Sequence, residues 1–256
     1  MTQQEMYLLV PRKLKEIEKE YGIRVLYAVE SGSRAWGTNS EHSDFDIRFL
    51  YIRPAQDYLR LVPYRDVLEF GVTDGWDMSG WDLTKTLQLL NTANSQIYEW
   101  FASPIVYVDE GFSQRIRPLL DGYFSTRSAV YHYLSQAERK MRKTQNSEEA
   151  KVKHYLYALQ HLAAARWILQ NEKSVNLDFQ GLMPMLTEEI RQEAQVLLRH
   201  KITRPDQPRI PHNLWLEEWL WQEHDRIRQI LKTFGPEPDR PWEPLDRFFL
   251  EELDRM

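Results

Sequence analysis

Hydrophobic and polar residues follow two different patterns along the chain, and the first half mixes helical and extended spacing. Residues 13–21 carry apolar side chains at helical spacing and end at Gly22, which predicts a helix. Residues 31–37 predict a turn into a short helix, and a further helix begins near Asp82. Stretches rich in β-branched and aromatic residues predict strands at 23–30, 45–52, 67–71 and 76–81.

The second half of the chain is patterned almost entirely for helices. Four segments carry apolar residues every three or four positions, with prolines between them: 128–145, 148–170, 187–201 and 214–234. We therefore predict an α+β fold, in which a small mixed β-sheet with flanking helices is followed by an all-helical domain. The expected domains are residues 1–110 and 111–256, with the boundary inside the region 108–126.

Composition supports a globular protein and excludes several classes of site. Hydrophobic residues make up 42% and charged residues 28% of the 256 residues, and the formal net charge is -5. An acidic balance disfavours binding of long nucleic acid over a broad surface. The absence of cysteine excludes disulfides and thiolate zinc sites. No apolar stretch approaches the roughly 20 residues of a membrane span, and the charged N-terminus does not resemble a signal peptide. We expect a cytoplasmic protein without membrane contact, and predict no particular oligomeric state.

Asp44 and Asp46 are the first candidates for chemistry. Residues two apart in a strand point to the same face, so these carboxylates are predicted to project side by side. Like charges this close repel unless a cation lies between them, and carboxylate oxygens suit Mg²⁺ or Mn²⁺. Phosphoryl transfer can use two such ions, about 3.5–4 Å apart.

A glycine–serine turn precedes the carboxylate pair. Gly32 and Ser33 lie where a predicted strand passes into a helix, and exposed N–H groups at such a turn favour a phosphate. Arg34 follows directly, and either a phosphate or an ion pair with Glu30 would explain it. Arg48 continues the face of Asp46 and is expected either to contact phosphate or to hold the carboxylates in place.

Other basic and aromatic residues are further candidates for binding phosphate. Lys85 lies in the first turn of a predicted helix. Lys153 and Tyr157 share one helical face because they are four residues apart, and they follow a basic run that includes Arg139, Lys140, Arg142 and Lys143. Such a run is usually a solvated face, so a phosphate site and a simple surface are both open interpretations.

The order of strand, Gly-Ser turn and Asp-x-Asp resembles the DNA polymerase beta superfamily of nucleotidyltransferases. The sequence is most similar to a bacterial and phage family of predicted nucleotidyltransferases associated with RNA ligase and RNA repair. Five motifs carry this resemblance in order: GSRAWG (32–37), SDFDIRFLYIRP (43–54), GWDLTKTLQLL (80–90), EWFASPIVY (99–107) and KHYLYALQHLAAARWIL (153–169).

The resemblance implies roles for particular residues. Asp44 and Asp46 would bind metal, and Gly32 and Ser33 would hold a triphosphate. A third carboxylate on a later strand would bind metal as well and assist deprotonation of the acceptor. We choose Asp77 for this role, with Asp82 and Glu69 as alternatives; Asp82 also fits a helix N-cap.

The implied activity is metal-dependent transfer of a nucleoside monophosphate from a nucleoside triphosphate, such as ATP, to an acceptor hydroxyl, with release of pyrophosphate. An RNA 3′ end is the expected acceptor because of the more similar family. Transfer of AMP to a protein or to a small molecule such as an aminoglycoside is an alternative. A different class of function, an inactive nucleotide-binding or interaction module, would be favoured if no third carboxylate could approach the pair.

Overall fold

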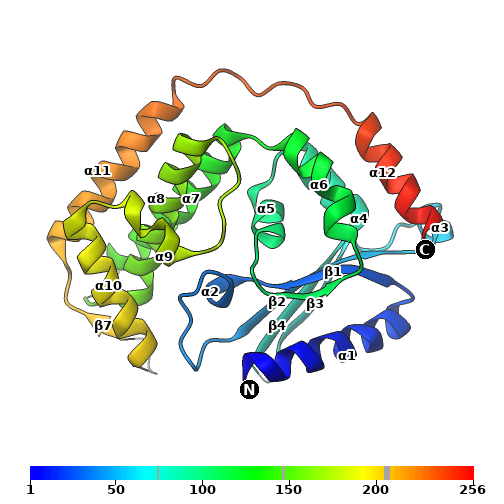
Figure 1. Ribbon diagram of the computed structural model, residues 1–256, viewed down its shortest axis with the longest axis horizontal. Helices are drawn as coiled ribbons and strands as arrows, with labels where there is room; N and C mark the ends of the chain where they lie inside the picture. The colour runs from blue at the N-terminus through cyan, green and yellow to red at the C-terminus, as the bar shows by residue number, and fades with distance from the viewer. Residues whose placement is uncertain (74, 146–147, 205–207) are drawn as a thin grey trace. The chain divides into compact units, whose positions relative to one another are not determined.

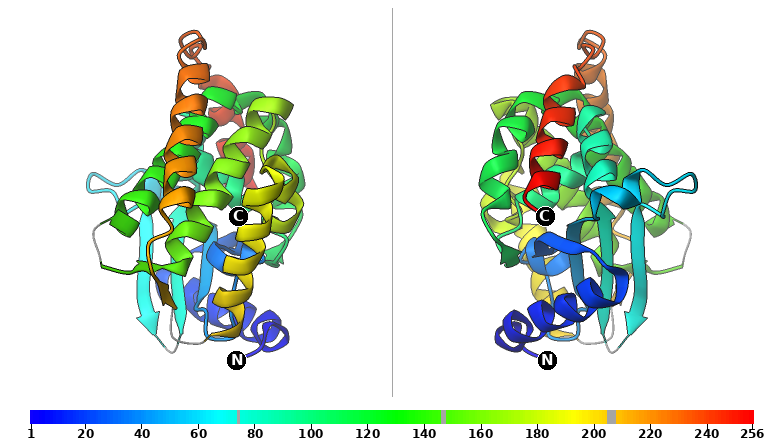
Figure 2. Two further views of the ribbon diagram at one scale, coloured as in Figure 1. Left: turned by 90° about the vertical axis from the view of Figure 1, so that its left-hand side faces the viewer. Right: turned by 90° about the vertical axis from the view of Figure 1, so that its right-hand side faces the viewer.

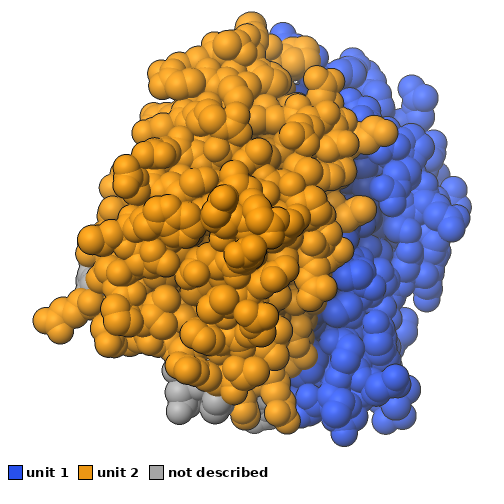
Figure 3. All heavy atoms as spheres, turned by 60° about the vertical axis from the view of Figure 1, so that its left-hand side comes forward, with its two compact units in different colours: residues 1–32, 44–123, 239–256 blue, residues 33–43, 124–238 orange. Residues whose placement is uncertain are grey.

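A computed structural model describes residues 1–73, 75–145, 148–204 and 208–256. The chain forms two compact units, coloured separately in Figure 3. The first contains Met1–Gly32, Asp44–Tyr123 and Asp239–Met256, and the second contains Ser33–Ser43 and Phe124–Pro238. The predicted α+β class with a mixed sheet is confirmed, since the first unit holds the sheet and the second is mostly helical.

The sheet of the first unit, within the described residues, has five strands in the order β3-β4-β2-β1-β5. Strands β2 and β4 are parallel, and the other neighbouring pairs are antiparallel. Figure 2 shows the β3–β4 hairpin at the edge of this sheet, in cyan. The strands are β1 (Arg24–Glu30), β2 (Phe45–Ile52), β3 (Val67–Thr73), β4 (Trp76–Asp82) and β5 (Val106–Asp109).

Helix α1 (Gln3–Tyr21) covers one face of the sheet (Figure 1). Its buried side chains recur every three or four residues, which places them on one stripe of the helix. They share a core with alternate residues of β2, namely Phe45, Ile47, Phe49 and Tyr51. The residues between these, starting with Asp46 and Arg48, therefore point to the opposite face.

That opposite face carries the other helices of the first unit (Figure 1). Trp81 of β4 packs on Trp100 of α5 with ring centroids 4.0 Å apart. The C-terminal segment returns to this layer, where Arg115 forms a 2.6 Å ion pair with buried Glu252. These helices are α4 (Leu83–Asn91), α5 (Ser95–Phe101), α6 (Phe112–Tyr123) and α12 (Glu243–Asp254), with a short α3 (Ala55–Tyr58) beyond β2.

The second unit is built on the long helices α7 (Thr126–Gln145) and α8 (Val152–Asn171), which pack along each other. Helix α8 is buried around most of its circumference, as its apolar composition requires. The remaining elements are α9 (Phe179–Leu182), a 3₁₀ turn η1 (Met183–Met185), α10 (Glu188–Thr203), α11 (Leu214–Leu231) and a short β6 (Ala150–Lys151) paired with β7 (Arg209–Ile210).

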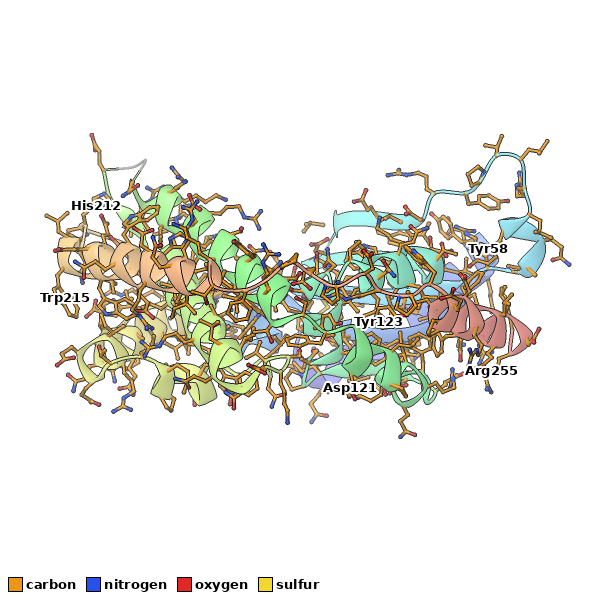
Figure 4. All side chains as sticks on the ribbon, turned by 90° about the horizontal axis from the view of Figure 1, so that it is seen from above. Tyr58, Asp121, Tyr123, His212, Trp215 and Arg255 are labelled. Carbon is orange, nitrogen blue, oxygen red and sulfur yellow. The ribbon has the colours of Figure 1, made fainter. Side chains whose placement is uncertain are left out.

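The compact units differ from the expected domains in three places. The division after α6 falls at Tyr123 rather than at residue 110, because α6 packs on β1 and α4. The C-terminal residues belong to the first unit, where the hydroxyl of Tyr123 (labelled in Figure 4) donates to the carbonyl of Pro241. Segment 33–43 belongs to the helical unit: Trp36 is buried against Tyr133, and Lys201 donates to the carbonyl of Thr38.

Several elements are not predicted by the pattern of residues. Helices α5 and α6 and strand β5 lie between the two clearly patterned halves, and β6 and β7 are each two residues long. Short elements such as β5 carry too few residues to establish a period. Among the helices of the described residues, none has both the length and the apolar character needed to span a membrane.

Candidate active site

Two acidic side chains lie next to each other on neighbouring parallel strands. Asp46 of β2 is the register partner of Asp77 of β4. Register partners point to the same side of a sheet, and here that side is the one opposite α1, because Ile47 and Met78 point into the α1 core. The structure thus brings Asp46 and Asp77 together.

Arg48 bridges these two carboxylates. Its Nη2 lies 2.7 Å from Oδ2 of Asp77 and 3.4 Å from Oδ1 of Asp46. Its Nη1 donates to the backbone carbonyl of Asp77 at 2.9 Å. The guanidinium therefore offsets the repulsion between two negative charges. Of the two roles expected for Arg48, the observed contacts are those of holding the carboxylates in place.

The backbone at Gly32 approaches Asp46 so closely that only glycine fits. Gly32 has a φ of 61°, and a Cβ at this position would lie 2.0 Å from Oδ2 of Asp46. The adjoining backbone is tied to the same residue, because the N–H of Ser31 donates to the carbonyl of Asp46 at 2.7 Å. The turn that begins α2 (Gly32–Ala35) is therefore packed directly on one of the candidate carboxylates.

A buried glutamate supports Asp46 from the other side of the sheet. Glu30 is fully buried and pairs with Ile47, so it points toward α1. Its Oε1 accepts the backbone N–H of Asp46 at 2.7 Å, and its Oε2 accepts the hydroxyl of Tyr107. Burial, and after it the hydrogen bond to Glu30, raise the pKa of Tyr107. The hydroxyl of Tyr107 therefore keeps its proton and donates the hydrogen bond to Glu30.

Asp44 lies directly before β2. It is exposed, and the strand begins at the next residue, Phe45, so the predicted alignment of Asp44 with Asp46 stays a prediction. Within the described ranges, no three His, Cys, Asp or Glu side chains are arranged to hold a metal ion. Asp46 and Asp77, which are 29% and 35% exposed, still form an accessible pair of carboxylates whose oxygens fit a hard divalent cation.

The two alternatives to Asp77 lie elsewhere. Asp82 is buried at the far end of β4, where it caps α4 by accepting the N–H of Thr84 at 2.8 Å. It also accepts the hydroxyl of Tyr58, labelled in Figure 4, and burial raises its pKa. Glu69 lies on the edge strand β3, exposed and 3.8 Å from Arg65. Strand β4 separates Glu69 from β2.

Lys85 is not brought to Asp46 and Asp77. Lys85 follows Asp82, the last residue of β4, whereas Asp77 lies near the start of that strand. The five residue steps from Asp77 to Asp82 span about 17 Å, at roughly 3.4 Å per strand residue. The Nζ of Lys85 forms a 3.2 Å ion pair with Asp66. A first-turn position on α4 therefore does not make Lys85 a neighbour of the carboxylates.

Ser33 and Arg34 follow Gly32 in the chain and belong to the helical unit. The carbonyl of Ser33 accepts the N–H of Thr38 at 2.9 Å, and Arg34 donates to the carbonyl of Ser43 at 2.7 Å. These hydrogen bonds close the loop between the Gly-Ser turn and β2.

Lys153 and Tyr157 lie on α8 in a group of basic side chains. The Tyr157 ring has the Nζ of Lys140 at 5.2 Å and the Nζ of Lys201 at 5.6 Å from its centroid. Lys140 comes from α7 and Lys201 from α10, so three helices contribute. Burial, and then Lys153 and Arg34, lower the pKa of Lys201 to about 8. Burial and the neighbouring cations also lower the pKa of Lys140.

Comparison with known families agrees with this architecture. A sequence model of the family described as "RlaP: RNA repair pathway DNA polymerase beta family" matches residues 6–251. The chain belongs to the RlaP family. By family it is therefore a nucleotidyltransferase of the polymerase beta type, as the resemblance of its motifs predicted.

Alignments with two individual proteins cover most of the chain. An uncharacterised protein, YcgL, of Bacillus subtilis (strain 168) is 34% identical over 248 residues, which cover 95% of each chain. The crystal structure of a nucleotidyltransferase-like protein from Exiguobacterium sibiricum aligns over 94% of this chain and 78% of its own, with 14% identity and a TM-score of 0.28.

The sequence pattern does not identify three residues that shape the Asp46–Asp77 pair and the group of basic side chains around Tyr157. Tyr107 lies inside the motif EWFASPIVY, which is the one signal for it in the sequence. The residue pattern indicates Glu30 only as an ion-pair partner for Arg34. Lys201 belongs to none of the five motifs, and its neighbours are revealed only by the packing of α10 on α8.

We predict that Gly32→Ala displaces Asp46. The new methyl group would overlap the carboxylate, so we expect about 10–100-fold weaker Mn²⁺ binding in titration calorimetry. Gly22→Ala is the matched control, because Gly22 has the same φ of 61° and open space around it. Both variants should lose about 1–2 kcal/mol of unfolding free energy through backbone strain. Equal Mn²⁺ affinity in the two variants would contradict the prediction.

We predict that Arg48→Gln increases stabilisation by Mn²⁺. Removing the guanidinium leaves Asp46 and Asp77 repelling each other, so the variant without metal should be less stable than the wild type. A divalent ion bound between the carboxylates would then not compete with Arg48, and a tenfold gain in affinity would add about 1.4 kcal/mol at saturating Mn²⁺. Thermal unfolding with and without Mn²⁺ measures this. Arg65→Gln, at an exposed ion pair of the same unit, should respond to Mn²⁺ as the wild type does.

We predict that Lys201 makes the free energy of unfolding increase with pH in the alkaline range. Its pKa is lowered from the ordinary lysine value of 10.5, which the unfolded chain retains, to about 8 in the fold. The unfolded chain therefore binds more protons between these values, and the unfolding free energy contributed by Lys201 rises as pH increases through this window. Urea unfolding of the wild type and Lys201→Met at about pH 7 and about pH 10 should show the wild type gaining relative to the variant. A constant difference would refute the assignment.

Proposed function

We propose that this RlaP-family protein transfers a nucleoside monophosphate from a nucleoside triphosphate to the 3′ hydroxyl of an RNA. The acceptor oxygen attacks the α-phosphorus, the bond from that phosphorus to the bridging oxygen breaks, and pyrophosphate leaves. The observation that carries the proposal is the pairing of Asp46 with Asp77 beside the turn at Gly32. An inactive binding module would have no need to keep two carboxylates together with a glycine backbone against one of them.

The residues of the proposed site would have distinct roles. Asp44, Asp46 and Asp77 would hold Mg²⁺ or Mn²⁺, with two ions in the complete site, and Asp77 would take the proton of the acceptor hydroxyl. Bound divalent ions would supply charge neutralisation for the phosphates. Backbone N–H groups at Gly32 and Ser33 would hold the triphosphate. Arg34, Lys153 and Tyr157 of the helical unit stay predicted phosphate contacts. Arg48 would position Asp46 and Asp77, and the location of Lys85 leaves it without a role here.

The family description supports the choice of acceptor. The description of the RlaP family refers to an RNA repair pathway, and this supports an RNA end over the other acceptors. Attack by a 3′ hydroxyl needs only local contacts near the terminus, which is compatible with a net charge of -5. A cytoplasmic location stays a prediction.

We predict that Asp46→Asn and Asp77→Asn each abolish most of the transfer. Labelled nucleoside triphosphates would be incubated with Mg²⁺ or Mn²⁺ and an RNA, and the labelled product and pyrophosphate would be measured. Loss of a general base lowers rates by about 10²–10⁴-fold, and loss of a metal ligand should act at least as strongly. Glu69→Gln is the matched control, because it removes an exposed carboxylate from the same sheet and should keep wild-type activity.

The same assay distinguishes the acceptors. Single-stranded RNA, the same RNA with a blocked 3′ end, DNA, a protein mixture and an aminoglycoside would each be offered. The proposal expects labelling of RNA that the 3′ block prevents. Labelling of protein or aminoglycoside alone would replace the RNA acceptor, and transfer that survives Asp46→Asn would count against this site.

A further inference from the structure

The helical unit contains a cluster of lysines around Tyr157. Lys140 of α7, Lys153 of α8 and Lys201 of α10 lie on three different helices. Two of their ammonium groups lie within 5.6 Å of the centroid of the one tyrosine ring, and Lys153 lies one helical turn before that ring. Packing of α7 and α10 against α8 therefore holds these positive charges at fixed positions.

The burial of Lys201 is the unusual feature of this lysine cluster. Its exposed fraction is 9%, whereas lysine is almost never buried unless it is paired. Its Nζ donates to the carbonyl of Thr38, which is a neutral partner. The charged neighbours that shift its pKa are Lys153 and Arg34, and both are cations. Lys140 is likewise half-buried and influenced by Lys143, Arg139 and Lys153.

Burying Lys140 and Lys201 near other cations costs free energy, which a bound anion would offset. Desolvation and the charges of their neighbours, Lys153 among them for both, disfavour the charged forms of these two lysines. A phosphate group would reverse both effects, because its oxygens accept hydrogen bonds from ammonium groups and its charge offsets theirs. The Tyr157 ring adds a surface that attracts the ammonium groups of Lys140 and Lys201.

We propose that Lys140, Lys153 and Lys201 form a phosphate-binding site in the helical unit, completed by the charge of Arg34. Lys140 and Lys201 are thereby assigned to ligand binding. The proposal deepens the proposed function, because that function provides two sources of phosphate: the triphosphate of the nucleotide and the phosphates near the end of the RNA. The shared chemistry is a phosphate bearing at least two negative charges.

Binding to the intact protein tests the site without requiring turnover. Sodium tripolyphosphate would be titrated calorimetrically in the absence of divalent metal, and a short 5′-phosphorylated RNA would be titrated separately. We expect Lys201→Met and Lys140→Gln each to raise Kd about tenfold or more for the ligand that occupies the site. Lys232→Gln is the matched control, because Lys232 is an exposed lysine of the same unit and should bind as the wild type does.

The two ligands distinguish the sources of phosphate. A loss confined to tripolyphosphate assigns the lysine cluster to the nucleotide, and a loss confined to RNA assigns it to the acceptor. Wild-type Kd values in both variants for both ligands, or an equal loss in Lys232→Gln, would overturn the proposal. If Lys201→Met does not fold, Lys140→Gln carries the test, since Lys140 is only half-buried.

The outcome is separable from that of the transfer assay. Phosphate binding that depends on Lys140 and Lys201 in a protein that transfers no nucleotide would leave the lysine cluster intact and reject the enzymatic proposal. Transfer with unchanged KM in both lysine variants would reject the lysine cluster and keep the enzyme.

Discussion

The parallel pairing of β2 with β4 is the constraint on which the candidate active site depends. Parallel neighbours align residues with a fixed register, and this register makes Asp46 and Asp77 partners. Placing two carboxylates side by side is unfavourable, and Arg48 provides the compensating charge through contacts to both. A slip of one residue would send one carboxylate into the α1 core. The apolar residues Ile47 and Met78, which occupy that core, therefore determine where the acids point.

The opposite face of the sheet contributes to the same arrangement. Glu30 is buried on the α1 side and accepts the backbone N–H of Asp46. A carboxylate is a stronger acceptor than a neutral carbonyl, and Tyr107 donates to its second oxygen. The backbone at Asp46 is thus held by Glu30 on one side, while Gly32 packs against its side chain on the other. Substitutions at Glu30 or Tyr107 would act on Asp46 through its backbone.

Sequence reasoning could predict the parts of this arrangement that depend on local pattern. The strands of the first half follow from β-branched runs, and α7, α8, α10 and α11 follow from helical spacing. The choice of Asp77 rests on its place in a predicted strand, and the register places it beside Asp46; its chemical role stays a prediction. Asp44 directly precedes the first residue of β2, Phe45, and its place in the site stays a prediction. Lys85 is a candidate from its place in a helix, and only the direction of β4 shows that it lies at the wrong end.

The sequence pattern does not predict contacts between segments that are far apart in the chain. Nothing in the composition of residues 33–43 indicates that this loop belongs with the helices, since the attachment depends on Trp36 and on the carbonyl of Thr38. Lys201 illustrates the same limit. In the sequence it resembles any lysine near a helix end, and only the structure shows that it is buried among other cations.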